Sequence, residues 1–180
     1  MTVTDTLLKR NRVFAARGLH AGLPLLPALR TTVIGCVDPR VDPAAVLDLD
    51  LGDAVIIRNI GGRFTAETFR TLAALRAIAD TESPEPGPGW NLILLHHTDC
   101  AATRLSRNQL DGLGIDPAPA VDGPAATLAA DIAAIRGNPL IPGELRVFGL
   151  VYDVATGLVD LLVPPAELRS GGGPGIVNGN

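Results

Sequence analysis

The chain is poor in aromatic residues, in clustered positive charge and in long apolar runs. Aromatic side chains make up only 3% of the 180 residues, so alanine and the aliphatic residues must fill the core. Lysine and arginine form no block and the formal net charge is −4, which argues against a surface for nucleic acid or anionic membranes. No apolar run reaches the roughly 18–20 residues of a membrane span. The N-terminal segment lacks the basic-then-apolar order of a secretory signal, so we expect a cytoplasmic protein.

Cysteine is equally scarce, because the chain holds only Cys36 and Cys100. This number is too small for a disulfide framework, and a reducing cytosol would keep both residues as thiols. A single disulfide between them is still compatible with the count alone. Metal ligation becomes the better interpretation once their sequence neighbours are considered.

Short apolar runs alternate with helical patterns along the chain. Apolar runs rich in β-branched residues predict strands at residues 32–37, 53–58, 91–95, 145–152 and 158–163. Good helix formers, some with apolar residues at helical spacing, predict helices at residues 4–17, 43–49, 65–79 and 125–136. Thr4 is the expected N-cap of the first helix. This alternation predicts an α/β fold with a mainly parallel central β-sheet of four or five strands, flanked by helices.

A length of 180 residues fits one domain with one hydrophobic core. We expect residues 31–168 to form this single α/β domain, and residues 1–30 to form an N-terminal helical arm ahead of it. Residues 169–180 are rich in glycine, and we expect a disordered tail there.

The residues that carry chemistry follow two of the predicted strands. Sites in parallel sheets form at the carboxyl ends of strands; Cys36 ends the first strand, and His97 and Cys100 follow the third. Thiolate and imidazole ligands suit Zn²⁺, and three protein ligands leave a fourth position for water. The spacing alone is equally compatible with two buried cysteines and an unrelated histidine. His96 is adjacent, and the sequence leaves open which histidine faces Cys36, because neighbouring side chains on an extended segment point in opposite directions.

The segment Cys36-Val-Asp38-Pro-Arg40 places a carboxylate and a guanidinium beside this cluster. Arginine can hold a carboxylate with two hydrogen bonds and keep it ionised and aimed. A carboxylate held in this way can accept a hydrogen bond from metal-bound water. The alternative is a surface ion pair in a turn, which contributes less than about 1 kcal/mol. A pair next to a metal thiolate therefore favours a catalytic site over a closed structural one.

Together these motifs resemble the β-carbonic anhydrase family, in its compact bacterial form. In chain order they are Cys36-x-Asp38-x-Arg40, Ile57-Arg58-Asn59-Ile60-Gly61 and His97-Thr98-Asp99-Cys100. The resemblance covers roughly residues 31 to 163. It implies zinc as the cofactor and gives separate roles to five residues. The implied metal ligands are Cys36, His97 and Cys100, and the implied catalytic residues are Asp38 and Arg40.

The resemblance also implies an activity and an assembly. The implied activity is that of a lyase: zinc-dependent, reversible hydration of carbon dioxide to bicarbonate and a proton by a zinc-bound hydroxide. The implied assembly is a homodimer or homotetramer in which the arm, residues 1–30, packs on the partner subunit. Two alternatives stay open. One is a carbonyl sulfide or carbon disulfide hydrolase that uses the same zinc site, and the other is a non-catalytic, zinc-stabilised oligomer.

Departures from the family pattern affect the expected substrate pocket. Ala101 follows Cys100 where glycine is usual in the family, and Ile60 stands where alanine is common. We expect the pocket to be formed by Ile60, Gly61, Gly62, Phe64 and Ala101.

Three charged residues near the motifs receive structural roles. We expect Arg58 and Arg63 to form ion pairs rather than an anion site. We expect Asp99 to anchor the turn between His97 and Cys100 through backbone N–H groups.

Overall fold

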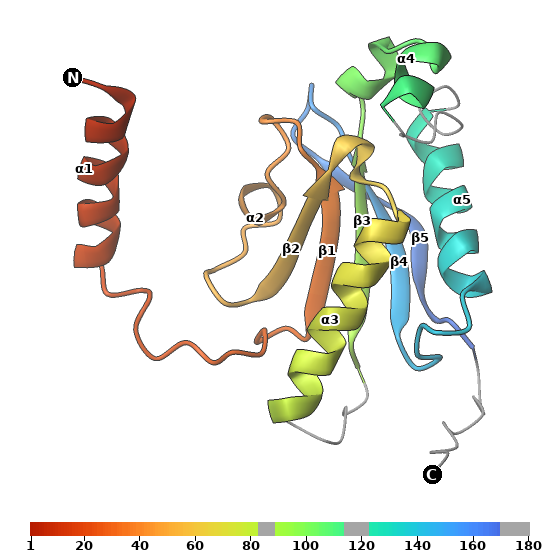
Figure 1. Cartoon of the computed structure of the whole chain (residues 1–180), viewed down its shortest axis with the longest axis horizontal. Helices are drawn as coiled ribbons and strands as arrows, with labels where there is room; N and C mark the ends of the chain where they lie inside the picture. Colours follow the sequence, from red (N-terminus) through yellow and green to blue (C-terminus); the bar gives the residue numbers. More distant parts are fainter. Residues whose placement is uncertain (83–88, 114–122, 170–180) are drawn as a thin grey trace.

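A five-stranded sheet forms the centre of the molecule in a computed structural model that describes residues 1–82, 89–113 and 123–169 (Figure 1). The strand order is β2-β1-β3-β4-β5, with β1 to β4 parallel and β5 antiparallel to β4. The strands are β1 (Thr31–Cys36), β2 (Ala54–Asn59), β3 (Asn91–His97), β4 (Arg146–Tyr152) and β5 (Val159–Glu167). The predicted α/β architecture with a mainly parallel sheet is therefore confirmed.

Helices cover the sheet unequally. The longer elements are α1 (Val3–Ala16), α3 (Ala66–Glu82) and α5 (Gly123–Gly137). The shorter ones are α2 (Pro43–Val46), α4 (Arg107–Gly112) and the single 3₁₀ turns η1 (Ile60–Gly62) and η2 (Ala101–Arg104). Helices α3 and α5 lie side by side on one face of the sheet, whereas α1 stands apart from the body (Figure 1).

The core consists of one apolar cluster on each face of the sheet, because successive strand residues point to opposite sides. Ile34 and Leu94 face α3 and α5, where they join a cluster that includes Leu128 and Ile132. Val33 and Leu95 face the other way, toward the short α2 region. Burial on both faces explains why β1 and β3 have almost uninterrupted apolar sequences.

The element boundaries differ from the sequence prediction in three instructive places. Thr2, not Thr4, caps α1, because Thr2 and Asp5 exchange hydrogen bonds in a capping box. Strand β3 continues beyond residue 95 to His97, so both histidines lie in extended backbone. Strand β5 runs on to Glu167 through two prolines, which an edge strand tolerates because one side of its backbone needs no hydrogen bonds.

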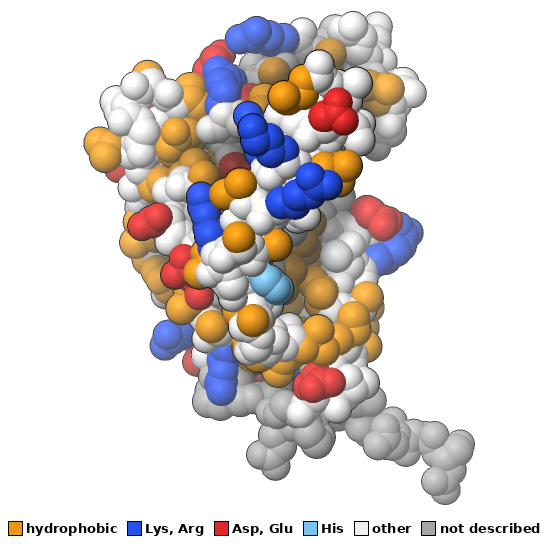
Figure 2. All heavy atoms as spheres, turned by 90° about the vertical axis from the view of Figure 1, so that its left-hand side faces the viewer, with side chains coloured by type: hydrophobic (Ala, Val, Ile, Leu, Met, Phe, Trp, Pro, Cys, Tyr) orange, Lys and Arg blue, Asp and Glu red, His pale blue; other side chains and the backbone are white. Residues whose placement is uncertain are grey.

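Helix α1 buries no residue against the rest of the described chain. Its apolar side chains Leu7, Leu8 and Val13 are each more than half exposed. Viewed from the side on which α1 lies, the molecule exposes hydrophobic side chains across that face (Figure 2). In the described part of the chain, no helix has the length and apolar character to cross a membrane.

The C-terminal residues expected to be disordered, 169–180, lie outside the described residues apart from Arg169. The Arg169 guanidinium donates hydrogen bonds to the backbone carbonyls of Arg136, Asn138 and Ile141, which follow or end α5. Arg169 is therefore held against the body of the domain, and the disorder expected of the other tail residues stays a prediction.

Candidate metal centre

The predicted ligands meet at the carboxyl edge of the sheet. Cys36 ends β1, His97 ends the neighbouring parallel strand β3, and Cys100 begins the turn η2 that follows. Among the described residues, one Sγ, Nδ1 or Nε2 atom from each of the three side chains lies within 4.8 Å of the others. The two sulfur atoms are 3.9 Å apart. Two sulfurs bound to one tetrahedral zinc at about 2.3 Å lie about 3.8 Å apart, so the spacing fits such an ion.

His97, not His96, shares this cluster with the cysteines. The Nδ1 of His97 donates a hydrogen bond to the backbone carbonyl of Thr98 at 2.9 Å, so the neutral form of the ring carries no proton on Nε2. This Nε2 is buried and has no hydrogen-bond partner among the described residues. A metal-binding histidine has this arrangement: one ring nitrogen donates a hydrogen bond to a carbonyl, which fixes the ring, and the other nitrogen is available to the metal.

His96 points to the opposite side of β3, as the two-residue period of a strand requires. Its Nε2 lies 3.2 Å from the backbone oxygen of Gly62 and 3.7 Å from a carboxylate oxygen of Asp131. The ambiguity that the sequence leaves between the histidines is thus resolved by the contacts of the two rings, since His97 joins the two cysteines and His96 contacts Gly62.

The two thiols are electrostatically coupled. The hydrogen bond from Cys100 lowers the pKa of the Cys36 thiol far below its usual range, and the same contact raises the pKa of Cys100. One thiolate therefore forms readily even without a metal. A divalent cation between the sulfurs would remove the mutual repulsion and favour both thiolates, which is the donor set that zinc prefers.

Asp38 and Arg40 form the expected pair beside the cysteines. Arg40 donates from Nε to Oδ1 at 3.1 Å, from Nη2 to Oδ2 at 2.8 Å and from its backbone N–H to Oδ1 at 3.0 Å. The Asp38 side chain is only 7% exposed, which separates this pair from an ordinary surface ion pair. The side-chain hydrogen bonds from Arg40 hold the pKa of Asp38 well below its usual range, so the carboxyl group is ionised at neutral pH.

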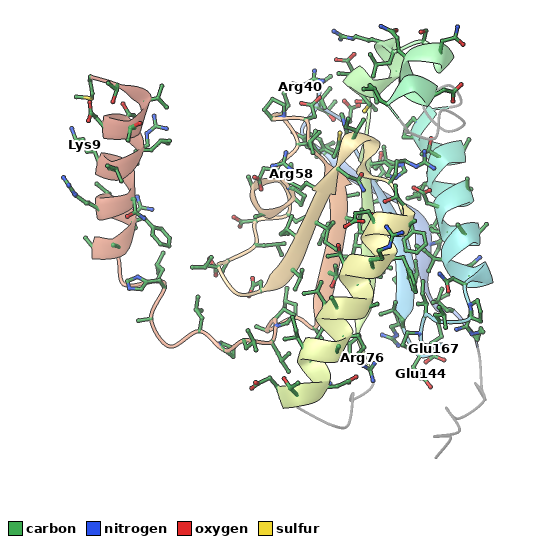
Figure 3. All side chains as sticks on the ribbon, in the orientation of Figure 1. Lys9, Arg40, Arg58, Arg76, Glu144 and Glu167 are labelled. Carbon is green, nitrogen blue, oxygen red and sulfur yellow. The ribbon has the colours of Figure 1, made fainter. Side chains whose placement is uncertain are left out.

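Arg58 fixes the backbone that carries this pair. Its guanidinium donates to the carbonyl of Cys36 at 2.9 Å and to the carbonyl of Asp38 at 2.8 Å, and it pairs with Asp42 at 3.2 Å. Figure 3 places Arg40 and Arg58 at the same end of the sheet, far from Glu144 and Glu167 at the other end. The ion pairing predicted for Arg58 is confirmed, and its remaining donors position the loop.

The glycine turn after β2 allows the close approach of three segments. Gly62 has a positive φ of 67°, and a Cβ added there would lie 3.0 Å from the backbone nitrogen of Cys36 and 3.2 Å from the carbonyl of Leu95. Any larger residue would push η1 away from β1 and β3. Gly62 is thus required for packing behind the ligands.

A cavity of about 250 Å³ opens beside the cluster, between η1, η2, α4 and the start of α5. Of the predicted pocket residues, Ile60 and Gly61 line it. The other three do not: Gly62 is buried behind the ligands, Phe64 packs against the core, and Ala101 points to solvent. Lining residues that the sequence prediction missed include Arg63, His96, Ala102, Leu110 and Thr127.

A buried ion pair supports the wall of this cavity. Arg63 donates from Nε and Nη2 to the two carboxylate oxygens of Asp131, each at 2.8 Å, and the backbone N–H of Phe64 adds a third bond at 3.1 Å. Burial alone would raise the pKa of Asp131, but the contacts with His96 and Arg63 outweigh it and lower the pKa. The ion pairing expected of Arg63 is confirmed, whereas its partner Asp131 was missed.

Asp99 departs from its expected role. Its carboxylate faces Arg40 at 2.8 Å and Arg104 at 3.2 Å rather than the backbone N–H groups of its own turn. The reason is local: the left-handed backbone of Asp99, with φ 49°, turns the side chain outward toward the loop that carries Arg40.

The chain is similar to known proteins along most of its length. The family model for carbonic anhydrase matches residues 31–116. The chain is 31% identical over 172 residues to β-carbonic anhydrase 1 of Mycobacterium tuberculosis, covering 91% of this chain and all of that protein. The crystal structure of the Streptococcus mutans carbonic anhydrase superposes with a TM-score of 0.71 at 31% identity, covering 90% of this chain and 98% of that one.

A second group of relatives is more distant. The carbon disulfide hydrolase of Acidithiobacillus thiooxidans is 26% identical over 160 residues, which cover 71% of this chain and 74% of that protein. The nearly full-length match at 31% identity carries more weight than this weaker one. With a metal-ligand cluster at the sheet edge and a relative matched over its whole length, the chain belongs to the β-carbonic anhydrase family.

Proposed function

We propose that this protein is a zinc-dependent carbonic anhydrase that hydrates carbon dioxide reversibly to bicarbonate and a proton. The observation that carries the proposal is the juxtaposition of two features. One is the three-residue donor cluster, Cys36, His97 and Cys100. The other is the ionised carboxylate of Asp38, which Arg40 holds beside that cluster.

The donor set fits zinc because it offers two sulfurs at the right separation and an orphaned imidazole nitrogen. Cys36, His97 and Cys100 would hold the ion. When bound, zinc would supply a Lewis acid that brings the pKa of a water molecule close to neutrality. Three protein donors leave one tetrahedral position open for this water.

Asp38 would orient the reacting water. Its Oδ1 already accepts two hydrogen bonds, from the backbone and Nε of Arg40, whereas Oδ2 accepts only one from the described residues, from Nη2. Each carboxylate oxygen has about two acceptor sites, so Oδ2 retains one. An ionised carboxylate can only accept a hydrogen bond, so a water next to Oδ2 must donate its O–H toward Oδ2 and present a lone pair elsewhere.

The cavity walls would favour a small apolar substrate. Ile60, Leu110 and Pro124 contribute aliphatic surface, and the Arg63 charge in the wall is already neutralised by Asp131. Among the described lining residues, Arg63 and Asp99 are both in ion pairs, and such walls admit carbon dioxide more easily than a charged molecule, because desolvating a charge is costly.

Replacing Asp38 by Asn tests the catalytic role directly. The amide keeps the shape of the side chain but brings an N–H₂ donor to an oxygen position that must accept. We expect kcat/KM for carbon dioxide hydration to fall by about 10- to 100-fold while the zinc content stays unchanged. Stopped-flow hydration and metal analysis on the same preparation measure both quantities.

The matched control is Asp80→Asn, the same chemical change in the exposed Arg76–Asp80 pair of α3. This control should match the wild type. Equal rates for wild type and Asp38→Asn would remove Asp38 from the mechanism, and near-zero rates in both would favour a non-catalytic, zinc-stabilised oligomer.

A carbon disulfide or carbonyl sulfide hydrolase is the second candidate, and it rests on the similarity to two carbon disulfide hydrolases at 26% and 27% identity. Both substrates are linear and apolar, as carbon dioxide is, and the same donor cluster and carboxylate would serve them. Sulfide release on incubation with either compound, without rapid hydration of carbon dioxide, would establish this alternative instead.

We also propose that the arm, residues 1–30, packs on a second copy of the chain in a homodimer or homotetramer. The exposed Leu7, Leu8 and Val13 support this, because an isolated helix that buries no apolar surface is marginally stable in water. Light scattering should give at least twice the 18.7 kDa chain mass, and changing these three residues to Asp should lower the mass toward one chain. Lys9→Ala, on the same helix, is the control. A monomeric wild type would contradict the proposal.

The cytoplasmic location stays a prediction. Both cysteines of the cluster are free thiols. A reducing compartment would keep them available to a metal.

A further inference from the structure

Asp99 sits between two members of the donor cluster, one residue before Cys100 and two after His97. Its backbone adopts the left-handed region, with φ 49°. Aspartate and asparagine tolerate this region better than most residues. The turn therefore places a carboxylate at a position fixed by the same backbone that aims the ligands.

Asp99 contacts Arg40 twice from this position. Its carboxylate oxygen Oδ2 accepts from Nη1 of Arg40 at 2.8 Å, and its backbone carbonyl accepts from Nη2 at 2.9 Å. The other edge of the same guanidinium carries the bonds to Asp38. Every nitrogen of the Arg40 guanidinium thus has a partner on one of two aspartates that flank it.

We propose that Asp99 is a positioning residue that fixes Arg40 against Asp38 and so ties the ligand loop to the catalytic carboxylate. This inference rests on the proposed function. It assigns Asp99 no contact with the substrate or with zinc. Asp99 acts only through Arg40, because its contacts restrict the guanidinium to one orientation.

The need for such an anchor follows from exposure. The Arg40 side chain is 46% exposed, whereas that of Asp38 is 7% exposed. A half-exposed arginine gives up side-chain entropy to stay in one orientation, and water competes for its donors, even where the carboxylate that it holds is buried. A second carboxylate together with a carbonyl restricts the guanidinium to a single plane, and Arg104 restrains the outer oxygen of Asp99 at 3.2 Å.

The ordinary surface ion pairs of the molecule have a different form. Arg70–Glu67 and Arg76–Asp80 each join residues one turn apart on α3. Arg40 and Asp99 are separated by 59 residues and join the two loops that carry the donor cluster. A contact of this kind couples the positions of those loops, which a pair within one helix cannot do.

Asp99→Gly is the test variant, because glycine accepts the positive φ and removes only the carboxylate. We expect kcat/KM for carbon dioxide hydration to fall by about tenfold, as for other groups that orient a catalytic side chain. Zinc affinity, measured by competition with a chelator, should stay at the wild-type value. Asp99→Asn keeps an oxygen acceptor for Arg40 and should restore part of the lost rate.

A double-mutant cycle with Arg40→Ala separates this role from simple folding of the loop. If Asp99 acts through Arg40, then Asp99→Gly should cause no further loss of rate in the Arg40→Ala background. The Nε–H of Arg40 offers a readout independent of activity, because it bonds to Asp38. Its exchange with water, followed by NMR, should be faster in Asp99→Gly than in the wild type.

Each contrary result has a distinct meaning. An active wild type with an unimpaired Asp99→Gly variant would overturn the inference and leave the proposed function intact. The same loss of rate in both Arg40 backgrounds, or weaker zinc binding in Asp99→Gly, would show that Asp99 serves the fold of the ligand loop and would also overturn it. A zinc-loaded wild type that hydrates no carbon dioxide would instead remove the proposed function on which the inference rests.

Discussion

Changing His97 to Asn is expected to remove zinc and carbon dioxide hydration together, whereas the same change at the adjacent His96 should preserve both. His97 shares the donor cluster with the two thiols, and its buried Nε2 has no hydrogen-bond partner in the part of the chain that the structure describes. Asparagine is too short to place a donor there. We expect the hydration rate to fall by more than about 100-fold, which exceeds the loss typical of groups that only support a ligand.

His96 is the matched control because it is equally buried and lies one residue away. Asparagine is too short to keep the bond from Nε2 of His96 to the Gly62 carbonyl, so this control loses a buried hydrogen bond of its own but no member of the donor cluster. Metal analysis and stopped-flow hydration on both variants show which of the two histidines binds zinc. A zinc-free His96→Asn together with a zinc-loaded His97→Asn would reverse the ligand assignment.

Asp131→Ala is expected to cause the largest loss of stability. The Arg63 side chain is 13% exposed and that of Asp131 is 3% exposed, so the alanine would leave a nearly buried guanidinium without a counter-charge. Breaking a buried pair in this way costs about 3–5 kcal/mol. The backbone N–H of Phe64 would lose its acceptor as well.

Urea denaturation at one fixed protein concentration measures this effect, since the stability of an oligomer depends on concentration. Asp80→Ala, in an exposed pair, is the control and should lower the free energy of unfolding by less than about 1 kcal/mol. If the two variants were equally stable, the buried pair would have no special role in holding the cavity wall.

Much of the fold is predictable from local pattern. The runs that became β1, β3 and β4 are apolar because the inner strands of a parallel sheet are buried on both faces, and the run that became β2 is apolar although β2 lies at the edge of the sheet and is half-buried. The ends of these strands then locate the donor cluster, since Cys36 and His97 finish adjacent parallel strands. The ligand residues could therefore be grouped before any coordinates were known.

Other features depend on contacts between distant segments. Asp131 was missed although it lies on the apolar face of α5 with Leu128, Ile132 and Ile135, where a lone carboxylate signals a buried partner. The partner, Arg63, lies 68 residues away, so no local pattern could name it. The choice of His97 over His96 likewise depended on which ring contacts the two cysteines. The pocket was only partly predicted, because α4 and α5 supply walls that the motifs do not mention.

The central claim is that zinc bound at Cys36, His97 and Cys100 enables this chain to hydrate carbon dioxide. Its most direct test is the stopped-flow hydration rate of the purified protein, measured as zinc is removed with a chelator and then restored. We predict a rate that rises in proportion to zinc content, up to one zinc per chain, as expected for the one such cluster among the described residues. Zinc-loaded protein without hydration activity, or activity that survives complete removal of the metal, would contradict it.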